Sequence, residues 1–326
     1  ELTKIIPDLL KSESCNCAQY ARQMDKWGVA GCEKRFDEIV EHLLNQAKKL
    51  PFPTLTIINR CFAKKWLTEA IDNCRPPSQE RNGMWYVAVT TAPRKECTLE
   101  QCVESLRKCG WEPTIFAEPN STSIKANYVW NTHKKGVWHN WLNAARVALE
   151  SNAEMILTVQ DDSLFHPDSK TFMESIEWPS RSAGFVSLYT PKHYTITRLG
   201  EWRPVGINQI STSSLWGACA LVWQRETLET LVNHKFTKTW LGARPRSGNK
   251  QVYESRKADP STIANSDTAI GMVLSKMNKN FWFVDPSPVS HIAKYSTIAH
   301  GSNDGRRNAI RIADHNIPLL DQVFPK

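Results

Sequence analysis

Long hydrophobic runs are missing from this chain of 326 residues. The longest runs, such as "ACALVW" at 218–223, have six residues, whereas a helix that crosses a bilayer needs about 20. The opening residues "ELTKIIPDLL" also lack the apolar core of a secretory signal peptide. We therefore expect a soluble globular protein that does not insert into a membrane.

A regular cysteine framework is missing as well. The nine cysteines are an odd number and are irregularly spaced, which favours a reducing compartment over a secreted, disulfide-linked scaffold. We expect a cytoplasmic location, in the host cytoplasm if the protein is viral.

Acidic residues are in the minority, since 33 Asp and Glu against 41 Lys and Arg leave a formal charge of +8. A basic chain favours polyanionic partners such as nucleic acid, phosphorylated substrates or anionic lipid head groups. The clusters at 133–136, 243–250 and 304–311 would recognise phosphate if they lay beside a binding site, and are otherwise solvated surface.

Residues 1–80 have the pattern of a small α-helical domain. Apolar residues recur at intervals of three and four in 36–47 and again in 63–71, which predicts two amphipathic helices. Paired prolines in "CRPPSQERNG" at 74–83 cannot continue a helix. We therefore place a domain boundary there, between residues 1–80 and 83–326.

From Gly83 onward, predicted strands alternate with predicted helices. The strands are expected at 84–91, 112–119, 155–160, 184–189 and 214–223, and the helices at 98–109, 138–151 and 225–232. This pattern predicts an α/β, Rossmann-like domain with a mostly parallel sheet. The polar stretch 243–266 is expected to be a long loop.

Two adjacent carboxylates, Asp161 and Asp162, directly follow the apolar strand "MILTVQ". Open α/β sheets bind ligands at the carboxyl ends of their strands. Neighbouring carboxylates repel each other unless a divalent cation or a basic group offsets their charge, and Mg²⁺ on a diphosphate uses one or two protein carboxylates. A solvated turn capped by Asp is the alternative explanation.

Five segments follow one another in a characteristic order: "YVAVTTAPR", "ILTVQDDS", "WGACALVWQRETLETL", "NSDTAIGMVL" and "VDPSPVSHIAKYST". In this order they resemble metal-dependent glycosyltransferases of the GT-A fold, from about Gly83 to about Ala299. The resemblance implies a GT-A-like domain that uses Mn²⁺ or Mg²⁺ and a nucleotide-sugar, with a UDP-sugar expected. The implied reaction is hexosyl transfer to an acceptor hydroxyl, with inversion.

The resemblance also implies roles for single residues. Asp162 and His291 correspond to metal ligands, although Ser163 replaces the second acid of the Asp-x-Asp element and leaves open which acid binds metal. Asp267 corresponds to a catalytic base, and a helix cap is its alternative; for His291 the alternative is a hydrogen bond within a loop. The implied donor-binding residues are Thr90, Thr91, Arg94, Glu118, Asp161, Lys294 and Ser296.

The stretch "CNCAQYARQMDKWGVAGC" resembles a Cys-x-Cys…Met-Asp-x-Trp-Gly…Gly-Cys helical module of phage and environmental bacterial proteins, which implies no established activity. The chain's candidate ligands for a structural Zn²⁺ are Cys15, Cys17, Cys32, Cys61 and Cys74. Their spacing departs from the paired C-x₂₋₄-C pattern of zinc sites, so ordinary buried thiols remain the alternative.

Tryptophan is abundant, with 13 residues in the chain. Trp130, Trp138, Trp202 and Trp216 fall near the expected rims of the site, where aromatic rings stack on sugars or unpaired bases. Trp138 and Trp141 also lie on the apolar face of a predicted helix, which favours packing for these two.

These observations support three hypotheses. The first is a glycosyltransferase whose acceptor is a 5-hydroxymethylpyrimidine in phage-type duplex DNA, reached by extruding the base, with a glycan or protein hydroxyl as the alternative acceptor. The second is a non-catalytic nucleic-acid-binding protein, for which no reading motif is present. The third is a nucleotidyltransferase, which "TTAPRKEC" disfavours because it lacks a glycine-rich triphosphate loop with a lysine.

The zinc hypothesis predicts a measurable composition. If at least four of the cysteine ligands converge, protein purified without a polyhistidine tag contains stoichiometric zinc, and a chelator lowers its melting temperature because metal binding stabilises the fold. Elemental analysis and thermal unfolding measure the two quantities. Absence of zinc together with unchanged melting would leave these thiols as packing residues.

Overall fold

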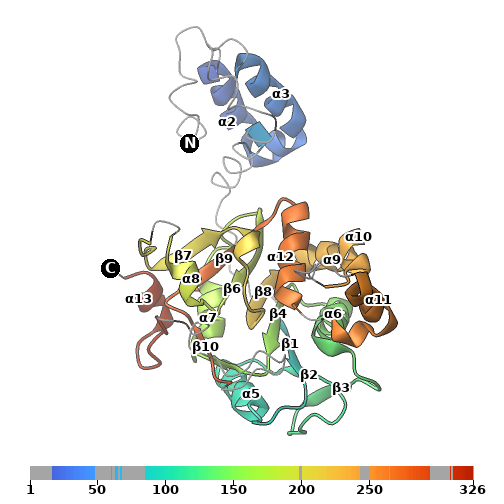
Figure 1. The fold of residues 1–326 in the computed structure, drawn as a ribbon. Coiled ribbons are helices and arrows are strands. Elements are labelled where there is room, and N and C mark those ends of the chain that lie inside the picture. The colour runs from blue at the N-terminus through green and yellow to red at the C-terminus, as the bar shows by residue number, and fades with distance from the viewer. Residues whose placement is uncertain are drawn as a thin grey trace. The chain divides into compact units, whose positions relative to one another are not determined.

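The computed structural model describes residues 17–47, 60, 63–64, 67, 85–197, 200–242, 250–263, 265–293, 309 and 311–325. The chain divides into two units, Glu1–Gln79 with Ser180–Ser182 and Glu80–Pro179 with Ala183–Lys326. Each unit has a hydrophobic core of its own, and Figure 1 draws the helices and strands of both units. Within these described ranges, no helix combines the length and apolar character needed to cross a membrane.

The first unit contains helices α2 (Cys17–Lys34) and α3 (Phe36–Ala47). Helix α2 is kinked at Gly28, whose φ of 63° is accessible to glycine at little steric cost. The predicted helix over 36–47 is confirmed, whereas most of the one predicted at 63–71 lies outside the described residues. The buried core of the unit comprises Met24, Cys32, Ile39, Val40, Ala63 and Leu67.

The second unit is built on an eight-stranded sheet with the order β3-β2-β1-β4-β8-β6-β9-β7. Strands β8 and β7 run antiparallel to their neighbours, and the remaining pairings are parallel. The predicted α/β class with a mostly parallel sheet is therefore confirmed. The strands are β1 (Trp85–Thr91), β2 (Thr114–Ala117), β3 (Asn127–Trp130), β4 (Met155–Gln160), β6 (Ala183–Ser187), β7 (Gly206–Ile210), β8 (Ala220–Gln224) and β9 (Asn280–Asp285).

Helices pack on both faces of this sheet (Figure 1). One face is covered by α5 (Leu99–Lys108), α7 (Ser169–Ser175) and α13 (Leu319–Val323), and the other by α6 (Gly136–Glu150), α9 (Arg225–Asn233) and α12 (Ser266–Lys276). In β4, Leu157 and Val159 join the first core and Ile156 joins the second. Because successive side chains of β4 point alternately into two hydrophobic cores, both faces of this strand are apolar.

The five tryptophans singled out in the sequence separate into a buried group and a half-exposed group. Trp138 and Trp141 are buried in α6, with ring centroids 5.5 Å apart in a stacked arrangement. Their predicted packing role is confirmed. Trp130, Trp202 and Trp216 are all about half exposed, at 46%, 54% and 51%.

Two expectations from the sequence are wrong in part. The stretch 243–266 is not all loop, because 250–258 forms helix α11 and 260–262 a turn of 3₁₀ helix, η4 (Lys250–Ala258 and Pro260–Thr262). Its polar composition suits an exposed helix as well as a loop. The strand expected at 214–223 is confined to β8, after the 3₁₀ helix η3 (Thr212–Ser214). The unit also contains the short helices α8 (Lys192–Thr195) and α10 (Lys235–Thr239).

A second, two-stranded sheet pairs β5 (Ser163–Phe165) with β10 (Val289–His291) in antiparallel fashion. Strand β5 follows β4 almost immediately, and β10 comes from more than a hundred residues later in the chain. In their register His291 lies opposite Ser163. The late part of the chain is thereby held against the carboxyl end of β4.

The C-terminal segment is attached to the sheet through an ion pair between the buried Asp285 and the partly exposed Arg311. Asp285, the last residue of β9, is fully buried and accepts a hydrogen bond from Nη2 of Arg311. Ser287 donates its N–H to the Arg311 carbonyl at 2.8 Å and accepts from the Ala313 N–H at 3.0 Å. Burial raises the pKa of Asp285 to about 6, against the opposing charge of Arg311.

Replacing Arg311 with Leu should lower the free energy of unfolding by about 3–5 kcal/mol, because Asp285 is left buried without a cation. The destabilisation by Arg311→Leu should be larger at about pH 8 than at about pH 5. Below its raised pKa the Asp285 carboxyl keeps its proton in the folded state and needs no cation. The stability that comes from this retained proton is lost as the pH rises through the pKa. Urea titrations measure both effects.

The double variant Asp285→Asn/Arg311→Leu is the control, since it removes the lone charge and should recover much of the lost stability. Equal destabilisation of the single and double variants at both pH values would contradict the ion-pair explanation.

Candidate active site

The candidate site lies where β1 and β4 end side by side. The two strands are parallel and in register from Trp85 opposite Met155 to Thr90 opposite Gln160, so their carboxyl ends meet at one edge of the sheet. Asp161 and Asp162, which follow β4, are only 2% and 6% exposed. The alternative of a solvated turn is excluded by this burial.

A basic side chain offsets the repulsion between the two acids. Arg94, from the loop after β1, donates from Nε and Nη2 to the two oxygens of Asp161, with Nε 3.1 Å from Oδ2. Its Nη1 donates to Oδ2 of Asp162 at 2.9 Å. Thr91 adds a hydrogen bond from Oγ1 to Asp161 Oδ2 at 2.5 Å. Both oxygens of Asp161 are therefore occupied by partners from the β1 side.

Asp162 has a different environment. Its Oδ2 accepts from Arg94 and lies 3.1 Å from Nε2 of His291, whereas its Oδ1 is buried and has no hydrogen-bond partner. A buried carboxylate oxygen without a partner is costly. This oxygen is the feature of the site that most clearly calls for a ligand.

The two acids also differ in their protonation equilibria. Burial raises the pKa of Asp161 above its usual value, against the opposing charge of Arg94. Burial acts in the same direction on Asp162, but the hydrogen bond with His291 and the charge of Arg94 outweigh it and lower the pKa of that carboxyl. Asp162 is thus the acid whose environment favours the ionised form.

Three potential metal ligands converge at Asp162. A carboxylate oxygen of Asp162, a ring nitrogen of His291 and Sγ of Cys219 all lie within 4.8 Å of one another. The β5–β10 register brings His291 here, and the Ile292 N–H fixes it further by donating to the Asp162 carbonyl at 2.9 Å. With the unpartnered Asp162 Oδ1, this donor set fits a divalent cation.

Sequence reasoning missed Cys219. It lies in the predicted strand at 214–223 and in the segment "WGACALVWQRETLETL", but nothing in its local sequence distinguishes it from a packing thiol. Its carbonyl accepts from the Gln160 N–H at 2.8 Å and from Ser163 Oγ at 3.1 Å. Ser163, which replaces the second acid of the Asp-x-Asp element, is fully buried and uses its hydroxyl in this way.

The other expected donor-binding residues divide into two groups. Thr90 donates from Oγ1 to the Val159 carbonyl at 3.2 Å, and Glu118, after β2, accepts from the Lys135 N–H at 2.9 and 3.2 Å. The Glu118 carboxylate thus satisfies a backbone donor at the start of α6, where negative charge is favourable. Lys294 and Ser296 lie outside the described residues.

Asp267 lies in the first turn of α12. Its Oδ1 accepts from the Thr268 N–H at 2.7 Å and its Oδ2 from the Gly217 N–H at 3.0 Å. The N-cap of α12 is Asn265, so Asp267 is not the cap that the alternative predicted, although its first bond satisfies an N–H in the first helical turn. The second bond ties Asp267 to the segment that leads into Cys219 and β8. Gly217 has a φ of 79°, the left-handed region that favours glycine.

The cysteine cluster proposed for zinc is largely outside the described part of the chain. This holds for Cys15, Cys61, Cys74 and the side chain of Cys17. Cys32 is buried and donates from Sγ to the Met24 carbonyl at 3.3 Å. The zinc hypothesis therefore stays a prediction.

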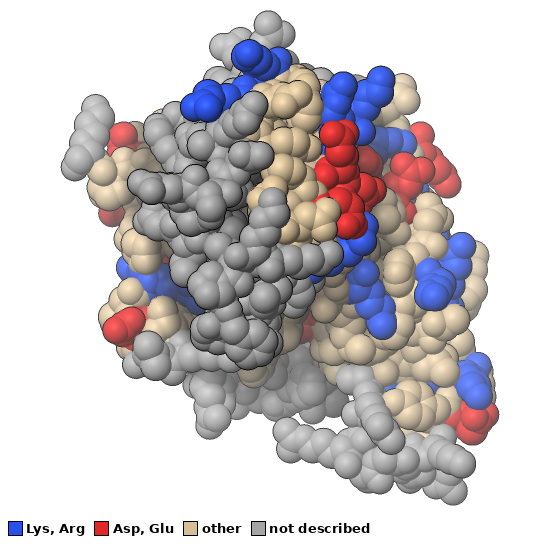
Figure 2. All heavy atoms as spheres, turned by 90° about the horizontal axis from the view of Figure 1, so that it is seen from above, with Lys and Arg blue, Asp and Glu red and all other residues tan. Residues whose placement is uncertain are grey.

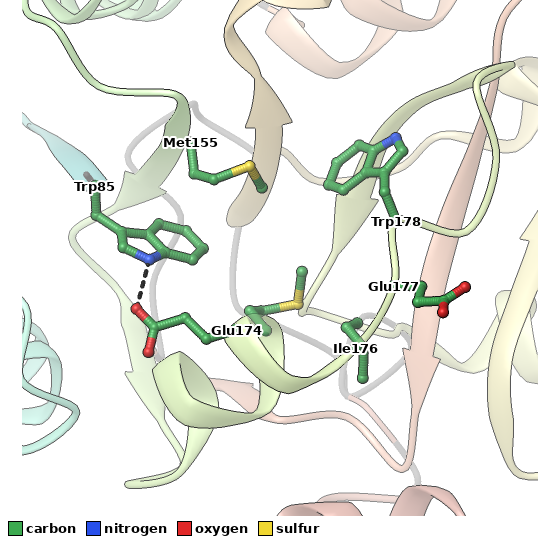
Figure 3. Close-up of a pocket in the computed structure, with 7 residues that line it drawn as sticks. Trp85, Met155, Glu174, Ile176, Glu177 and Trp178 are labelled. Atoms are coloured by element: carbon green, nitrogen blue, oxygen red, sulfur yellow. Dashed lines mark hydrogen bonds between the residues drawn. The ribbon is translucent and has the colours of Figure 1, made fainter. Parts of the chain in front are cut away.

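A small pocket lies at the opposite, amino-terminal ends of β1 and β4 (Figure 3). Trp85 and Met155, which begin β1 and β4, line it, and Trp85 Nε1 donates to Glu174 Oε1 at 2.9 Å. It is separated from the acids by the length of these two strands. Its other lining residues are Met173, Ile176, Glu177 and Trp178.

Basic side chains do not form one continuous surface on the face drawn in Figure 2. Among the described residues, Lys and Arg appear there in separate groups, with Asp and Glu gathered between some of them. Of the three basic clusters in the sequence, residues 243–249 and 301–308 are not described, and Arg311 pairs with Asp285.

Comparison with known proteins gives a distant structural match. No protein-family model matches the sequence, and no curated protein sequence is significantly similar to it. A mannosyltransferase of Pyrobaculum calidifontis, PcManGT in complex with GDP-Man and Mn²⁺, matches over 63% of this chain and 72% of its own, with a TM-score of 0.34 and 14% identity. A likeness this distant says nothing about the substrate or metal of this chain.

The role of Arg94 can be tested through stability. Arg94→Met leaves two buried carboxylates without their cation, so the free energy of unfolding in metal-free buffer should fall by about 3–5 kcal/mol. Saturating Mn²⁺ should stabilise this variant more than the wild type, because a bound cation then neutralises Asp162. Urea titrations with Mn²⁺ and with chelator measure the difference.

Arg107→Met is the matched control, because the Arg107–Glu112 pair is exposed at the surface and should contribute about 1 kcal/mol or less. An equal response to Mn²⁺ in the wild type and Arg94→Met would contradict a cation site at Asp162.

Proposed function

We propose that this chain is a metal-dependent glycosyltransferase that moves a sugar from a nucleotide-sugar to an acceptor hydroxyl. The observation that carries the proposal is the buried, unpartnered Oδ1 of Asp162 beside His291 and Arg94 at the carboxyl end of β4. When a nucleotide-sugar transfers its sugar, it releases a negatively charged nucleoside diphosphate. A cation beside Asp162 would neutralise that charge. The GT-A resemblance of the sequence supports the same assignment.

Asp162 and His291 are the residues that would hold the cation. A divalent cation held by these residues would supply stabilisation of the negative charge that develops on the departing diphosphate. Arg94 supplies a fixed positive charge beside the acids. Asp161, with both oxygens engaged by Arg94 and Thr91, keeps these two side chains oriented toward the donor.

The remaining donor contacts are assigned by the resemblance and the position of the strand ends. Thr90 and Thr91 end β1, and Glu118 follows the adjacent strand β2, so these residues lie along the edge at which a nucleotide would bind. Lys294 and Ser296, shortly after His291, complete the proposed diphosphate contacts. The proposed donor is a UDP-sugar and the proposed cation Mn²⁺ or Mg²⁺.

Asp267 is the proposed catalytic base. Its carboxylate takes the proton of the acceptor hydroxyl while the acceptor oxygen bonds to the anomeric carbon and the bond from that carbon to the diphosphate breaks, which inverts the configuration. The hydrogen bonds from Gly217 and Thr268 orient the carboxylate. The link to Gly217 supports a location near Cys219, two residues further along the chain.

For the acceptor, we propose the hydroxymethyl group of a modified pyrimidine in duplex DNA, with a glycan or protein hydroxyl as the alternative. The net charge of +8 and the half-exposed Trp202 and Trp216 support an anionic acceptor that contains planar bases.

The first experiment measures donor hydrolysis. Wild-type protein with Mn²⁺ should release nucleoside diphosphate from one member of a panel of nucleotide-sugars, and Asp162→Asn should slow this release at least about 100-fold, since a lost metal ligand removes several kcal/mol of leaving-group stabilisation. Asp259→Asn is the control, because Asp259 is an exposed cap of η4. Full activity of Asp162→Asn in excess chelator would overturn the metal assignment.

The same assay identifies the acceptor when duplex DNA with hydroxymethylated pyrimidines, glycans and peptides are compared. Binding of duplex DNA should weaken steeply with salt as counterions are released, whereas a neutral glycan should show almost no dependence. The basic residues Arg244, Arg246 and Lys250, which belong to the cluster at 243–250, should contribute to that slope. No measurable DNA affinity at low salt would favour the glycan or protein acceptor.

A further inference from the structure

We infer that Cys219 is a third protein ligand of the cation at Asp162 and His291, and that its sulfur makes the site selective for thiophilic divalent metals over Mg²⁺. This inference rests on the proposed function only for the presence of a cation there. It goes beyond the Asp and His ligands that the GT-A resemblance implies, since none of the motif residues predicts a sulfur donor.

The placement of Cys219 is the first argument. Its Sγ belongs to the same cluster as an oxygen of Asp162 and a ring nitrogen of His291, with all three atoms within 4.8 Å of one another. One cation can contact such atoms after small side-chain adjustments, because metal–ligand bonds to O, N and S are about 2.0–2.3 Å long. The unpartnered Oδ1 of Asp162 independently indicates a ligand at this place.

The backbone around Cys219 is held on both sides of the acids. Its carbonyl accepts one hydrogen bond from Gln160, just before the acids, and one from Ser163, just after them. A β-carbon on Gly217 would lie 3.5 Å from Cys219 Sγ, so the chain packs closely where it approaches the thiol. Cys219 is 4% exposed. The thiol itself donates from Sγ to Gln160 Oε1 at 3.7 Å, so both the backbone and the side chain of Cys219 are held beside the acids.

The chemistry of the donor set gives the selectivity. Mg²⁺ prefers oxygen ligands in an octahedral shell, whereas Co²⁺ and Zn²⁺ accept imidazole and thiolate and bind mixed N/O/S sites more tightly than Mn²⁺ does. Three protein ligands also leave coordination positions open, as in catalytic rather than structural sites. If a metal binds, the Cys219 thiol would release its proton to solvent and serve as a thiolate ligand.

Another thiol near the same strand provides a matched control. Cys102, on α5, is buried and donates from Sγ to the Gln160 carbonyl at 3.8 Å. It thus shares the burial of Cys219 and its closeness to Gln160, but it is not part of the three-ligand cluster. Cys102→Ser therefore reports what removal of a buried thiol does by itself.

The test uses the full chain, stripped with chelator and titrated with Co²⁺ without any nucleotide-sugar. The wild type and Cys102→Ser should show the near-ultraviolet thiolate-to-Co²⁺ charge-transfer absorption, and Cys219→Ser should lose the part of it that one thiolate contributes. Co²⁺ affinity should fall at least about tenfold in Cys219→Ser, because even the substitution of a residue that only hydrogen-bonds to a metal ligand lowers metal affinity by about that factor. Mg²⁺ affinity, measured by competition, should change less.

A charge-transfer band that is unchanged in Cys219→Ser, or absent from the wild type with Co²⁺ bound, would overturn the inference. Far-ultraviolet circular dichroism checks the fold of each variant. His291→Asn is a second variant that retains the thiol, and it should also weaken Co²⁺ binding. An unaltered Co²⁺ affinity in His291→Asn would count against the shared site even if Cys219→Ser did not fold.

The test of the sulfur ligand can succeed or fail whether or not the proposed function is correct. A Cys219-dependent band in a protein that hydrolyses no nucleotide-sugar would support the ligand and refute the glycosyltransferase. Turnover of a nucleotide-sugar with Mn²⁺ and no Cys219-dependent band would support the glycosyltransferase and refute the sulfur ligand.

Discussion

The pairing of Arg94 with Asp161 and Asp162 is the interaction on which the candidate site depends. Two neighbouring carboxylates that are almost fully buried cannot both be ionised without a nearby positive charge. Arg94 supplies it from the loop after β1, and the acids follow β4. The ion pair therefore joins the ends of two parallel strands and gives the acids unequal environments, with Asp161 fully engaged and Asp162 Oδ1 left without a partner.

The small β5–β10 sheet completes the site from a distant part of the sequence. Side chains on a strand alternate between its faces, so a slip of one residue in this register would turn His291 away from Asp162. The hydrogen bond from Ile292 to the Asp162 carbonyl and the pairing of His291 with Ser163 fix the register. On the other side, the two bonds to the Cys219 carbonyl attach β8 to the same few residues. The geometry around Asp162 is thus determined by backbone pairing.

The two hydrophobic cores cover the faces of the sheet and leave the carboxyl ends of β1 and β4 to the polar residues of the candidate site. Helices α5 and α6 cover opposite faces of the sheet, and apolar residues of β4 face both of them. Such a strand is rigid, and polar groups carried at its end are positioned more accurately than groups on a long loop. The burial that stabilises the sheet is also what lowers the local dielectric and strengthens every charge interaction among Arg94 and the acids.

The sequence by itself determined the features that arise from local periodicity. These are the helix at 36–47, the strands that contain β1 and β4, the helix that contains α5, and the arrival of Asp161 and Asp162 at a strand end. It did not predict β3, β5, β7, β9 or β10, or helix α11, because short strands and polar helices have weak patterns. The resemblance implied His291 and Asp162 as metal ligands, but the ion pairs of Arg94 with the two acids and the arrival of Cys219 beside them were decided only by the tertiary structure, since they depend on pairing between segments far apart in the chain.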